Sequence, residues 1–382
     1  MNPYAGETER ELAAAVGAWA AGLGPRIAAA EEAGTMPREI FKELAALGVL
    51  GMAVPERDGG LGLSTVAFAL VLEELAAAWA SLAVGVSVNS GIVAGSLVRN
   101  GTAEQRARWL PRLMDGDGLG AFGLTEPASG SDAASLRGTA CRDGTGWVLD
   151  GTKVFITNAR YAPCLIALLR VGEATPERPH TGITAFVVPL DAPGVTIGRP
   201  ERKLGLLASD TSAVVLERVR LGPDAVLGEV GKGFAIAMAG LDAGRIGIAA
   251  QATGIARSAL SLARAYAAER RQFGRPIAEF EMIRFPLARR ETEIAAARAL
   301  ALRAAWLRDR GRPFTREASM AKLFASEAAQ RATHTAVQVL GGYGYMREYG
   351  VERAARDARA TTIYEGTSEI QRLVIARSLL AA

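Results

Sequence analysis

The chain has 382 residues, of which 49% are hydrophobic and 22% are charged. This balance is typical of a globular protein of two or three domains, and it excludes disordered and fibrous proteins. Aromatic residues make up only 6%, and 44 basic residues nearly balance 40 acidic ones, so the composition favours close-packed helices.

The first third of the chain has a helical pattern. Apolar residues recur at spacings of three and four, as in Ile40, Leu44 and Leu47. The Asn100-Gly101 pair ends one predicted helix, and Thr102 is a plausible N-cap of the next. We therefore predict an N-terminal helical domain over residues 1–115.

The middle of the chain changes to the period of two that is typical of strands. Residues 147–149 and 152–157, joined by Asp150-Gly151, predict a β-hairpin with a two-residue turn. Further strands are predicted at 165–171, 184–188 and 212–221. These strands predict a middle β domain over residues 116–228.

The last third returns to long helical patterns. We predict helices at 234–268, 280–308, 315–340 and 367–380, within a C-terminal domain over residues 229–382. Because helices precede and follow the strands instead of alternating with them, the fold class is α+β and mainly α. The prediction is an N-terminal helical domain, a β-barrel-like middle domain and a C-terminal four-helix bundle.

Several classes of site and location are disfavoured by what the sequence contains. With only two His (His180 and His334) and two Cys (Cys141 and Cys164), we expect neither a metal site built on them nor a disulfide framework. The N-terminal segment lacks a basic signal-peptide start. Apolar runs such as 64–72 end at acidic residues, and we expect none to reach the roughly 18 residues that a membrane span needs. We expect no membrane insertion and a cytoplasmic location.

The excess of Arg over Lys could indicate a phosphate-bearing ligand, nucleic acid or simple composition. Only five of the 44 basic residues are Lys. Basic residues stand beside acids, as at 269–271 and 289–291, which is typical of solvated helix faces. We therefore expect no nucleic-acid partner.

Three segments could bind a ligand or do chemistry. Residues 122–132 could present backbone N–H groups and hydroxyls to a polar ligand, or form a simple Ser- and Gly-rich turn. Residues 151–158 could form a wall for a flat ring. Glu365 could be a general base in the apolar setting of Ile363 and Tyr364, or a surface acid beside a helix start. Thr367 or Ser368 can cap that helix, and Ser368 with Gln371 makes a capping-box pattern.

A nucleotide, if one binds, is not held by a common nucleotide-binding motif. The glycines at 341–344 follow a predicted helix instead of a strand and lack the Rossmann spacing, and no Walker A pattern occurs.

Five segments together resemble the acyl-CoA dehydrogenase family: 122–132, 151–158, 270–274, 338–342 and 363–371. Their order and spacing match over essentially the whole chain. Within the family, residues 241–249 and the surroundings of Glu365 are most similar to the short-chain, butyryl-CoA type. The resemblance implies the fold of that family.

The resemblance also implies FAD as cofactor. The residues matching one face of the cofactor, or the adjoining CoA chain, are Phe122, Leu124, Thr125, Gly130 and Ser131. The other face of the flavin ring would meet Phe155, Ile156 and Thr157, and the helix after the base would supply Thr367 and Glu369. Positions that reach the FAD of a neighbouring subunit are matched by Arg270, Phe273, Gln338, Gly341 and Gly342.

In the same way, Glu365 matches the catalytic base. Substrate contacts are implied for Ser131, Asp242, Arg245 and Gly366. Relatives that carry the base on another helix place it at the position of Gly244, which has no side chain here. The chain departs from the family pattern at Leu207, where an Arg is common, and at Glu281, where a Gln often helps to bind FAD.

The implied reaction is FAD-dependent α,β-dehydrogenation of a short- or medium-chain acyl-CoA to the trans-2-enoyl-CoA. The implied partners are an electron-transfer flavoprotein and further copies of the chain, in a homotetramer that is a dimer of dimers. Two alternatives are an acyl-CoA oxidase-like flavoprotein that uses O₂ and a non-catalytic nucleic-acid-binding protein.

Overall fold

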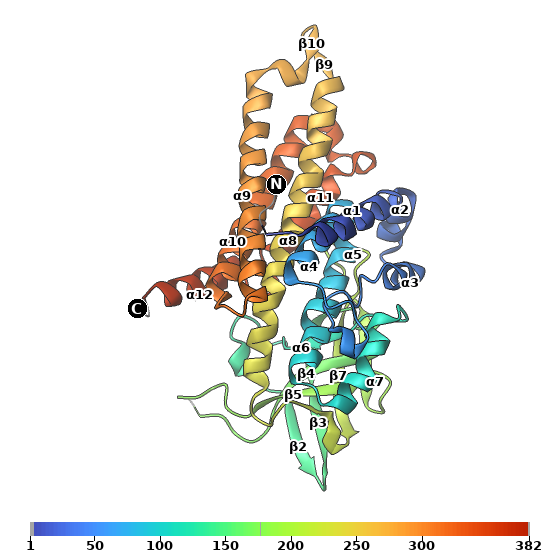
Figure 1. The fold of residues 1–382 in the computed structure, drawn as a ribbon, viewed down its shortest axis with the longest axis vertical. Coiled ribbons are helices and arrows are strands. Elements are labelled where there is room, and N and C mark those ends of the chain that lie inside the picture. Colours follow the sequence, from blue (N-terminus) through green and yellow to red (C-terminus); the bar gives the residue numbers. More distant parts are fainter. Residues whose placement is uncertain (1–3, 176, 381–382) are drawn as a thin grey trace.

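The computed structural model describes residues 4–175 and 177–380. Helices come first, strands follow, and long helices complete the chain (Figure 1). The first group consists of α1 (Glu7–Ala21), α2 (Gly24–Ala33), α3 (Glu39–Ala46), α4 (Thr65–Ala78), α5 (Ala80–Val86), α6 (Gly95–Asn100) and α7 (Ala103–Met114), with a 3₁₀ turn η1 (Glu56–Asp58) and a π-helical segment η2 (Ser87–Ala94).

The predicted N-cap of α7 is confirmed. The Thr102 hydroxyl accepts a hydrogen bond from the Gln105 backbone N–H at 3.2 Å, and the Gln105 side-chain oxygen accepts one from the Thr102 N–H at 3.1 Å. This reciprocal capping box satisfies two of the amides that a helix start leaves free.

The strands form one mixed sheet. They are β1 (Ala121–Gly123), β2 (Thr139–Asp143), β3 (Gly146–Thr157), β4 (Cys164–Arg170), β5 (Ile183–Pro189), β6 (Val195–Pro200), β7 (Thr211–Leu221) and β8 (Val226–Leu227). The hydrogen-bonded order is β6-β7-β3-β2-β4-β5-β8, with β1 paired in parallel to β4. Short turns η3 (Ala133–Ser135) and η4 (Pro223–Ala225) lie between strands.

The predicted hairpin at Asp150-Gly151 is wrong. Strand β3 continues through these residues, and the tight turn lies earlier, where Asp143 of β2 pairs with Gly146 of β3. Gly151 instead marks an irregularity in the pairing of β3 with β7. Its φ is +154°, and a Cβ there would approach the Gly138 Cα to 2.9 Å. A glycine within a strand can therefore mark a bulge as well as a turn.

The last group is built around α8 (Gly233–Glu269), which runs along the long axis of the molecule from the sheet to the β9–β10 hairpin (Figure 1). It is followed by β9 (Arg271–Gln272), β10 (Arg275–Pro276), α9 (Glu281–Asp309), α10 (Thr315–Leu340), α11 (Val351–Thr361) and α12 (Ser368–Leu380), with short turns η5 (Ile277–Glu279), η6 (Gly341–Tyr345) and η7 (Arg347–Tyr349). The sequence prediction missed α11, because its charged sequence buries only a narrow stripe that includes Val351 and Ala358.

One hydrophobic core joins the N-terminal helices to the C-terminal bundle. Val16 of α1, Leu72 of α4, Ile246 of α8 and Ala329 of α10 belong to the same cluster of buried residues. A small residue permits the close approach of α4 and α8, since a Cβ on Gly254 would lie 2.3 Å from the Glu73 carbonyl oxygen. The part of α8 that carries the predicted substrate residues Asp242 and Arg245 is thus held against a rigid core.

The expectation that no apolar stretch is long enough for a membrane span is wrong. Two helical stretches, Ala80–Asn100 and Gly233–Glu269, are long and apolar enough to cross a membrane. Within the protein, however, 89% and 67% of their most apolar windows are buried. Their apolar character is therefore accounted for by packing in the core.

The departure at Leu207 has a clear structural setting. The Leu207 backbone N–H donates to Glu31 at 3.2 Å, and the buried Glu31 carboxylate also accepts from Trp79 Nε1 at 2.7 Å and Ser81 Oγ at 2.5 Å. All three of these hydrogen-bond donors are neutral. Glu281, the other departure, is the first residue of α9.

Candidate active site

Glu365 lies in the turn between α11 and α12. Its φ is +53°, a left-handed conformation that is uncommon outside glycine, and Gly366 follows at +91°. The turn is held through its carbonyl oxygens: Lys322 Nζ donates to Gly366 O at 2.8 Å, and Gln371 Nε2 donates to Gly366 O at 2.8 Å and Glu365 O at 3.2 Å. These bonds fix an otherwise costly backbone conformation.

At the helix start after this turn, one of the two predicted caps is confirmed and the predicted capping box is not. Thr367 Oγ1 accepts from the Ile370 N–H at 3.4 Å, so Thr367 caps α12. The Gln371 side chain is used by the turn carbonyls, and the predicted Ser368–Gln371 capping box is therefore wrong. Gln371 instead supports the conformation of Glu365.

The Glu365 side chain lies directly on α8. A Cβ built on Gly244 would lie 2.0 Å from Glu365 Oε2. Both carboxylate oxygens are buried and have no hydrogen-bond partner among the described residues. Burial raises the pKa of Glu365 to about 7, although the positive charges of Lys322 and Arg245 act to lower it. The carboxylate is thus poised to exchange a proton near neutral pH.

Lys322 and Arg245 are the two buried cations that act on Glu365. Burial lowers the pKa of Lys322 to about 8, with Glu365 opposing this shift. Arg245 Nη1 pairs with Asp242 Oδ1 at 2.6 Å, and Asp242 Oδ2 accepts from Thr315 Oγ1 at 2.5 Å. The structure therefore brings the predicted substrate residues Asp242 and Arg245 to the same part of α8 as Gly244.

Tyr364 anchors the turn on its other side. Its hydroxyl donates to Gln251 Oε1 at 2.6 Å, and Gln251 Nε2 donates to the Ala80 carbonyl at 3.0 Å. The turn carrying Glu365 is thus tied to α8 and, through Gln251, to α5.

The loop after β1 is fixed by a buried ion pair that the sequence analysis did not identify. Lys153 Nζ of β3 lies 2.7 Å from Glu126 Oε1, and the exposed fractions of the two side chains are 0% and 6%. Glu126 also accepts from the backbone N–H groups of Arg137 and Gly138 at 2.6 and 2.9 Å. This pair holds Thr125 beside β3, where the Val154 N–H donates to Thr125 O at 3.0 Å.

The predicted flavin residues near this loop differ in exposure. Phe155 is 66% exposed and has a φ of +58°, so its ring turns outward from the strand. Ile156 and Leu124 are buried, Phe122, Thr125 and Thr157 are half-buried, and Gly130 and Ser131 are exposed. An exposed aromatic face beside hydroxyls and loop amides fits a flat ring with polar edges, so the residues present are compatible with FAD.

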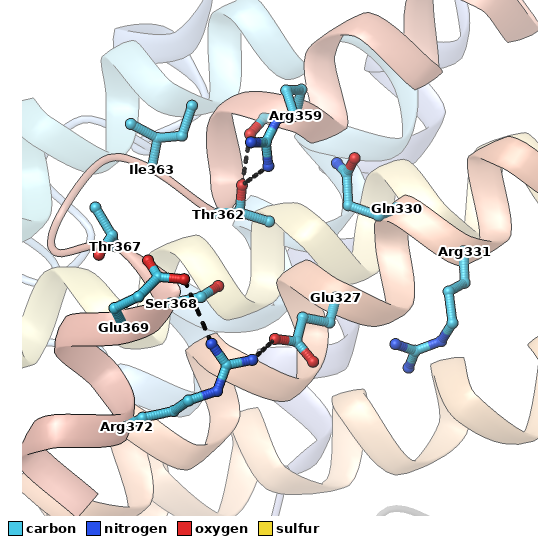
Figure 2. Close-up of a pocket in the computed structure, with 10 residues that line it drawn as sticks. All are labelled: Glu327, Gln330, Arg331, Arg359, Thr362, Ile363, Thr367, Ser368, Glu369 and Arg372. Atoms are coloured by element: carbon cyan, nitrogen blue, oxygen red, sulfur yellow. Dashed lines mark hydrogen bonds and ion pairs between the residues drawn. The ribbon is translucent and has the colours of Figure 1, made fainter.

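The predicted contacts after the base line a pocket of about 520 Å³ (Figure 2). Thr367 and Glu369 lie on its α12 side. Arg372 bridges Glu369 and Glu327, and Arg359 Nη1 donates to Thr362 Oγ1 at 2.6 Å. The wall of this pocket therefore carries both charge and hydroxyl groups close in sequence to Glu365.

The remaining predicted cofactor residues lie at the opposite end of α8. Arg270, Gly341 and Gly342 line a hollow of about 490 Å³, while Phe273 is 94% exposed and Gln338 is exposed on α10. Gly244 and Arg270 are 26 positions apart on one helix axis, or about 39 Å. One chain therefore does not bring these residues to Glu365.

Comparisons with protein families match all three parts of the chain. Residues 6–117 match the acyl-CoA dehydrogenase N-terminal domain, 121–219 the middle domain and 231–380 the C-terminal domain. Together with the fold, these matches define the class of the protein, a flavoprotein oxidoreductase.

The similarity extends to whole proteins. The chain is 46% identical over 358 residues to the short-chain specific mitochondrial acyl-CoA dehydrogenase of Bos taurus, covering 94% of this chain and 86% of that protein. Butyryl-CoA dehydrogenase from Megasphaera elsdenii has a TM-score of 0.95 at 39% identity, covering 98% of this chain and 99% of that one. The chain belongs to the acyl-CoA dehydrogenase family, as its motifs predicted, and is an enzyme.

A further structural relative comes from work on the electron transferring flavoprotein of Acidaminococcus fermentans. It has a TM-score of 0.96 at 37% identity and covers 100% of both chains.

Several supporting residues were missed by the sequence analysis. Lys322, one of only five lysines, lies one turn after Ala318 on the buried face of α10, and a lone lysine on an apolar helix face was a readable signal. Glu126, Lys153 and Gln251 gave no comparable signal, because their partners lie far away in sequence.

Proposed function

We propose that the enzyme dehydrogenates a short- or medium-chain acyl-CoA across Cα and Cβ to the trans-2-enoyl-CoA, with Glu365 as the base. The observation that carries the proposal is the buried, unpartnered Glu365 carboxylate packed on Gly244. The identity to short-chain acyl-CoA dehydrogenases supports the substrate class.

The surroundings of Glu365 suit removal of a weakly acidic α-proton. A carboxylate with a pKa of about 7 is a stronger base than an exposed glutamate and is still ionised in part at neutral pH. After it takes the proton, the neutral carboxyl group is favoured by the same buried setting. The Glu365 backbone N–H donates no hydrogen bond within the described residues, so it is free to polarise a thioester carbonyl.

FAD would accept the hydride that leaves Cβ. Phe155, Ile156 and Thr157 would lie against its ring, and the hydroxyl of Thr125 and the loop amides would bind its polar edge. Leu124, Phe122, Gly130, Ser131, Thr367 and Glu369 would complete the contacts made by one chain. Asp242, Arg245, Ser131 and Gly366 would bind the acyl-CoA.

A second copy of the chain would complete the cofactor site. The separation of Arg270 from Gly244 along α8 supports this, because Arg270, Phe273, Gln338, Gly341 and Gly342 cannot reach the same FAD from within the chain. An arginine and exposed glycines suit a diphosphate, which needs charge and close backbone approach. We propose a homotetramer, a dimer of dimers, that passes electrons to an electron-transfer flavoprotein; the cytoplasmic location stays a prediction.

Anaerobic stopped-flow absorbance with butyryl-CoA tests the proposal. Wild-type enzyme should lose the absorbance of oxidised flavin. Glu365→Gln should still contain FAD and bind butyryl-CoA, but its flavin should stay oxidised. Reduction by Glu365→Gln at the wild-type rate would show that another group is the base. Rapid peroxide release in air would favour the oxidase instead, and a chain-length series of acyl-CoA thioesters would define the preferred substrate.

A further inference from the structure

A second cavity lies away from Glu365, between the start of α4, helix α6 and the end of α9. Its volume is about 270 Å³, which is below the size of typical drug-binding pockets and suits a ligand of a few heavy atoms. Two arginines line it, Arg99 of α6 and Arg308 of α9. Neither belongs to the site described above.

The two arginines are not paired with an acid by direct contact. Neither guanidinium forms a hydrogen bond or ion pair with any described residue. Arg308 is half-buried and Arg99 is exposed. The Arg99 guanidinium lies over Gly95, where a Cβ would lie 3.2 Å from Nη1. Desolvation and the charge of Arg308 lower the pKa of Arg99 to about 10. Two like charges therefore line one hollow, and among the described residues Asp309 is the one acid that lines it with them.

The neighbouring acid is already engaged. Asp309 accepts hydrogen bonds from the backbone N–H groups of Thr65 at 2.7 Å and Val66 at 3.1 Å. Asp309 therefore caps the first turn of α4. With two arginines and one aspartate, the cavity keeps one net positive charge, which a single bound carboxylate would neutralise.

Apolar side chains make up much of the rest of the wall, although Thr65 and Ser90 also line it. The apolar lining residues are Ala53, Leu63, Phe68 and Val98. An inorganic anion would leave this surface without a partner, whereas a short hydrocarbon chain would bury against it. Phe68 also lies against α8, since its Cε1 is 3.5 Å from a Cβ built on Gly247.

From this arrangement we propose that the cavity binds a small aliphatic monocarboxylate, with the carboxylate between Arg99 and Arg308 and the hydrocarbon chain against Phe68 and Val98. The ligand would be a free acid, because a 270 Å³ cavity does not accommodate a CoA moiety. The site is separate from the substrate-binding residues proposed above.

Isothermal titration of the FAD-loaded enzyme with sodium butyrate, at ionic strength held constant with sodium chloride, tests the proposal. We expect saturable binding by wild-type enzyme that is weakened at least about tenfold in the Arg99→Met/Arg308→Met double variant. Arg289→Met, an exposed arginine on α9, is the matched control and should bind as wild type. Glu365→Gln should also bind as wild type, which separates this site from the reaction site.

The ligand-free double variant should unfold at or above the wild-type temperature, because the substitution removes a repulsion. If the double variant does not fold, the single variant Arg99→Met, whose side chain reaches solvent, carries the test. Absence of binding, unchanged binding in the arginine variants, or phosphate binding as tightly as butyrate would overturn the proposal.

Discussion

The Glu365 carboxylate lies against Gly244 and leaves no room for a side chain at position 244. The carboxylate of Glu365 occupies the space that any Cβ at position 244 would need, at 2.0 Å from Oε2. The family resemblance implies two positions for a base, matched here by Glu365 and Gly244. Side chains at these two positions would overlap in space. The missing side chain at 244 is therefore a requirement for Glu365 to lie where it does.

Gly244→Ala should displace the Glu365 carboxylate and slow flavin reduction by butyryl-CoA about a hundredfold, the cost of misplacing a catalytic group by about 1 Å. Gly240→Ala, one turn earlier on α8, is the control, since its Cβ would make only ordinary contacts with Ile92 and Ser96. Single-turnover rates measure the effect. A wild-type rate in Gly244→Ala would contradict the geometry of the contact.

The rate of flavin reduction at low substrate concentration should rise with pH and level off above the pKa of Glu365, about 7. Only the ionised carboxylate can accept the α-proton, so activity is lost as pH falls through this value. Stopped-flow rates between pH 5.5 and 9 would reveal the midpoint. A flat profile would mean that Glu365 is not the titrating base.

Lys322→Met should shift that midpoint upward by about one unit, because the substitution removes a positive charge that stabilises the Glu365 carboxylate. Lys232→Met, at an exposed lysine before α8, is the control and should leave the midpoint unchanged. A lower rate without a shifted midpoint would indicate that Lys322 acts only through its hydrogen bond to Gly366.

Asp357 should make the folded state less stable as pH rises. Burial and the nearby charge of Glu31 raise the pKa of Asp357 to about 7, against about 3.9 in an unfolded chain. Between these values the folded state binds more protons than the unfolded state. The free energy of unfolding therefore falls as the pH rises from about 4 to about 7. Asp357→Asn should weaken this dependence, whereas the exposed Asp191→Asn should not; thermal unfolding across the pH range decides.

Lys153→Met should destabilise the enzyme by about 3–5 kcal/mol, because it leaves the Glu126 carboxylate buried without its cation. The loop holding Thr125 should loosen, with loss of FAD. The double variant Lys153→Met/Glu126→Gln should recover much of the stability. Denaturant unfolding and flavin content provide the two measurements, and an equally unstable double variant would argue against the ion pair as the cause.

Sequence periodicity predicted the long helices well, because 315–340 and 281–309 present apolar faces over many turns. It failed at Gly151, where the same residue type that makes turns instead makes a bulge. It also missed α11, whose buried stripe is narrow.

The motif around Glu365 pointed to this residue as a base candidate. The sequence alone could not reveal what surrounds it, however. Gly244, Lys322 and Gln251 meet the turn only after α8 and α10 have packed, and such contacts depend on the distances between helices instead of on local pattern.

The length of α8 has a consequence for how the enzyme retains its flavin. Under the proposed assembly, the two ends of this helix contact two different FAD molecules. An isolated chain would therefore contain only part of each FAD site. Flavin occupancy would then obey mass action: dilution that separates the copies would release FAD, and added FAD would draw them back together.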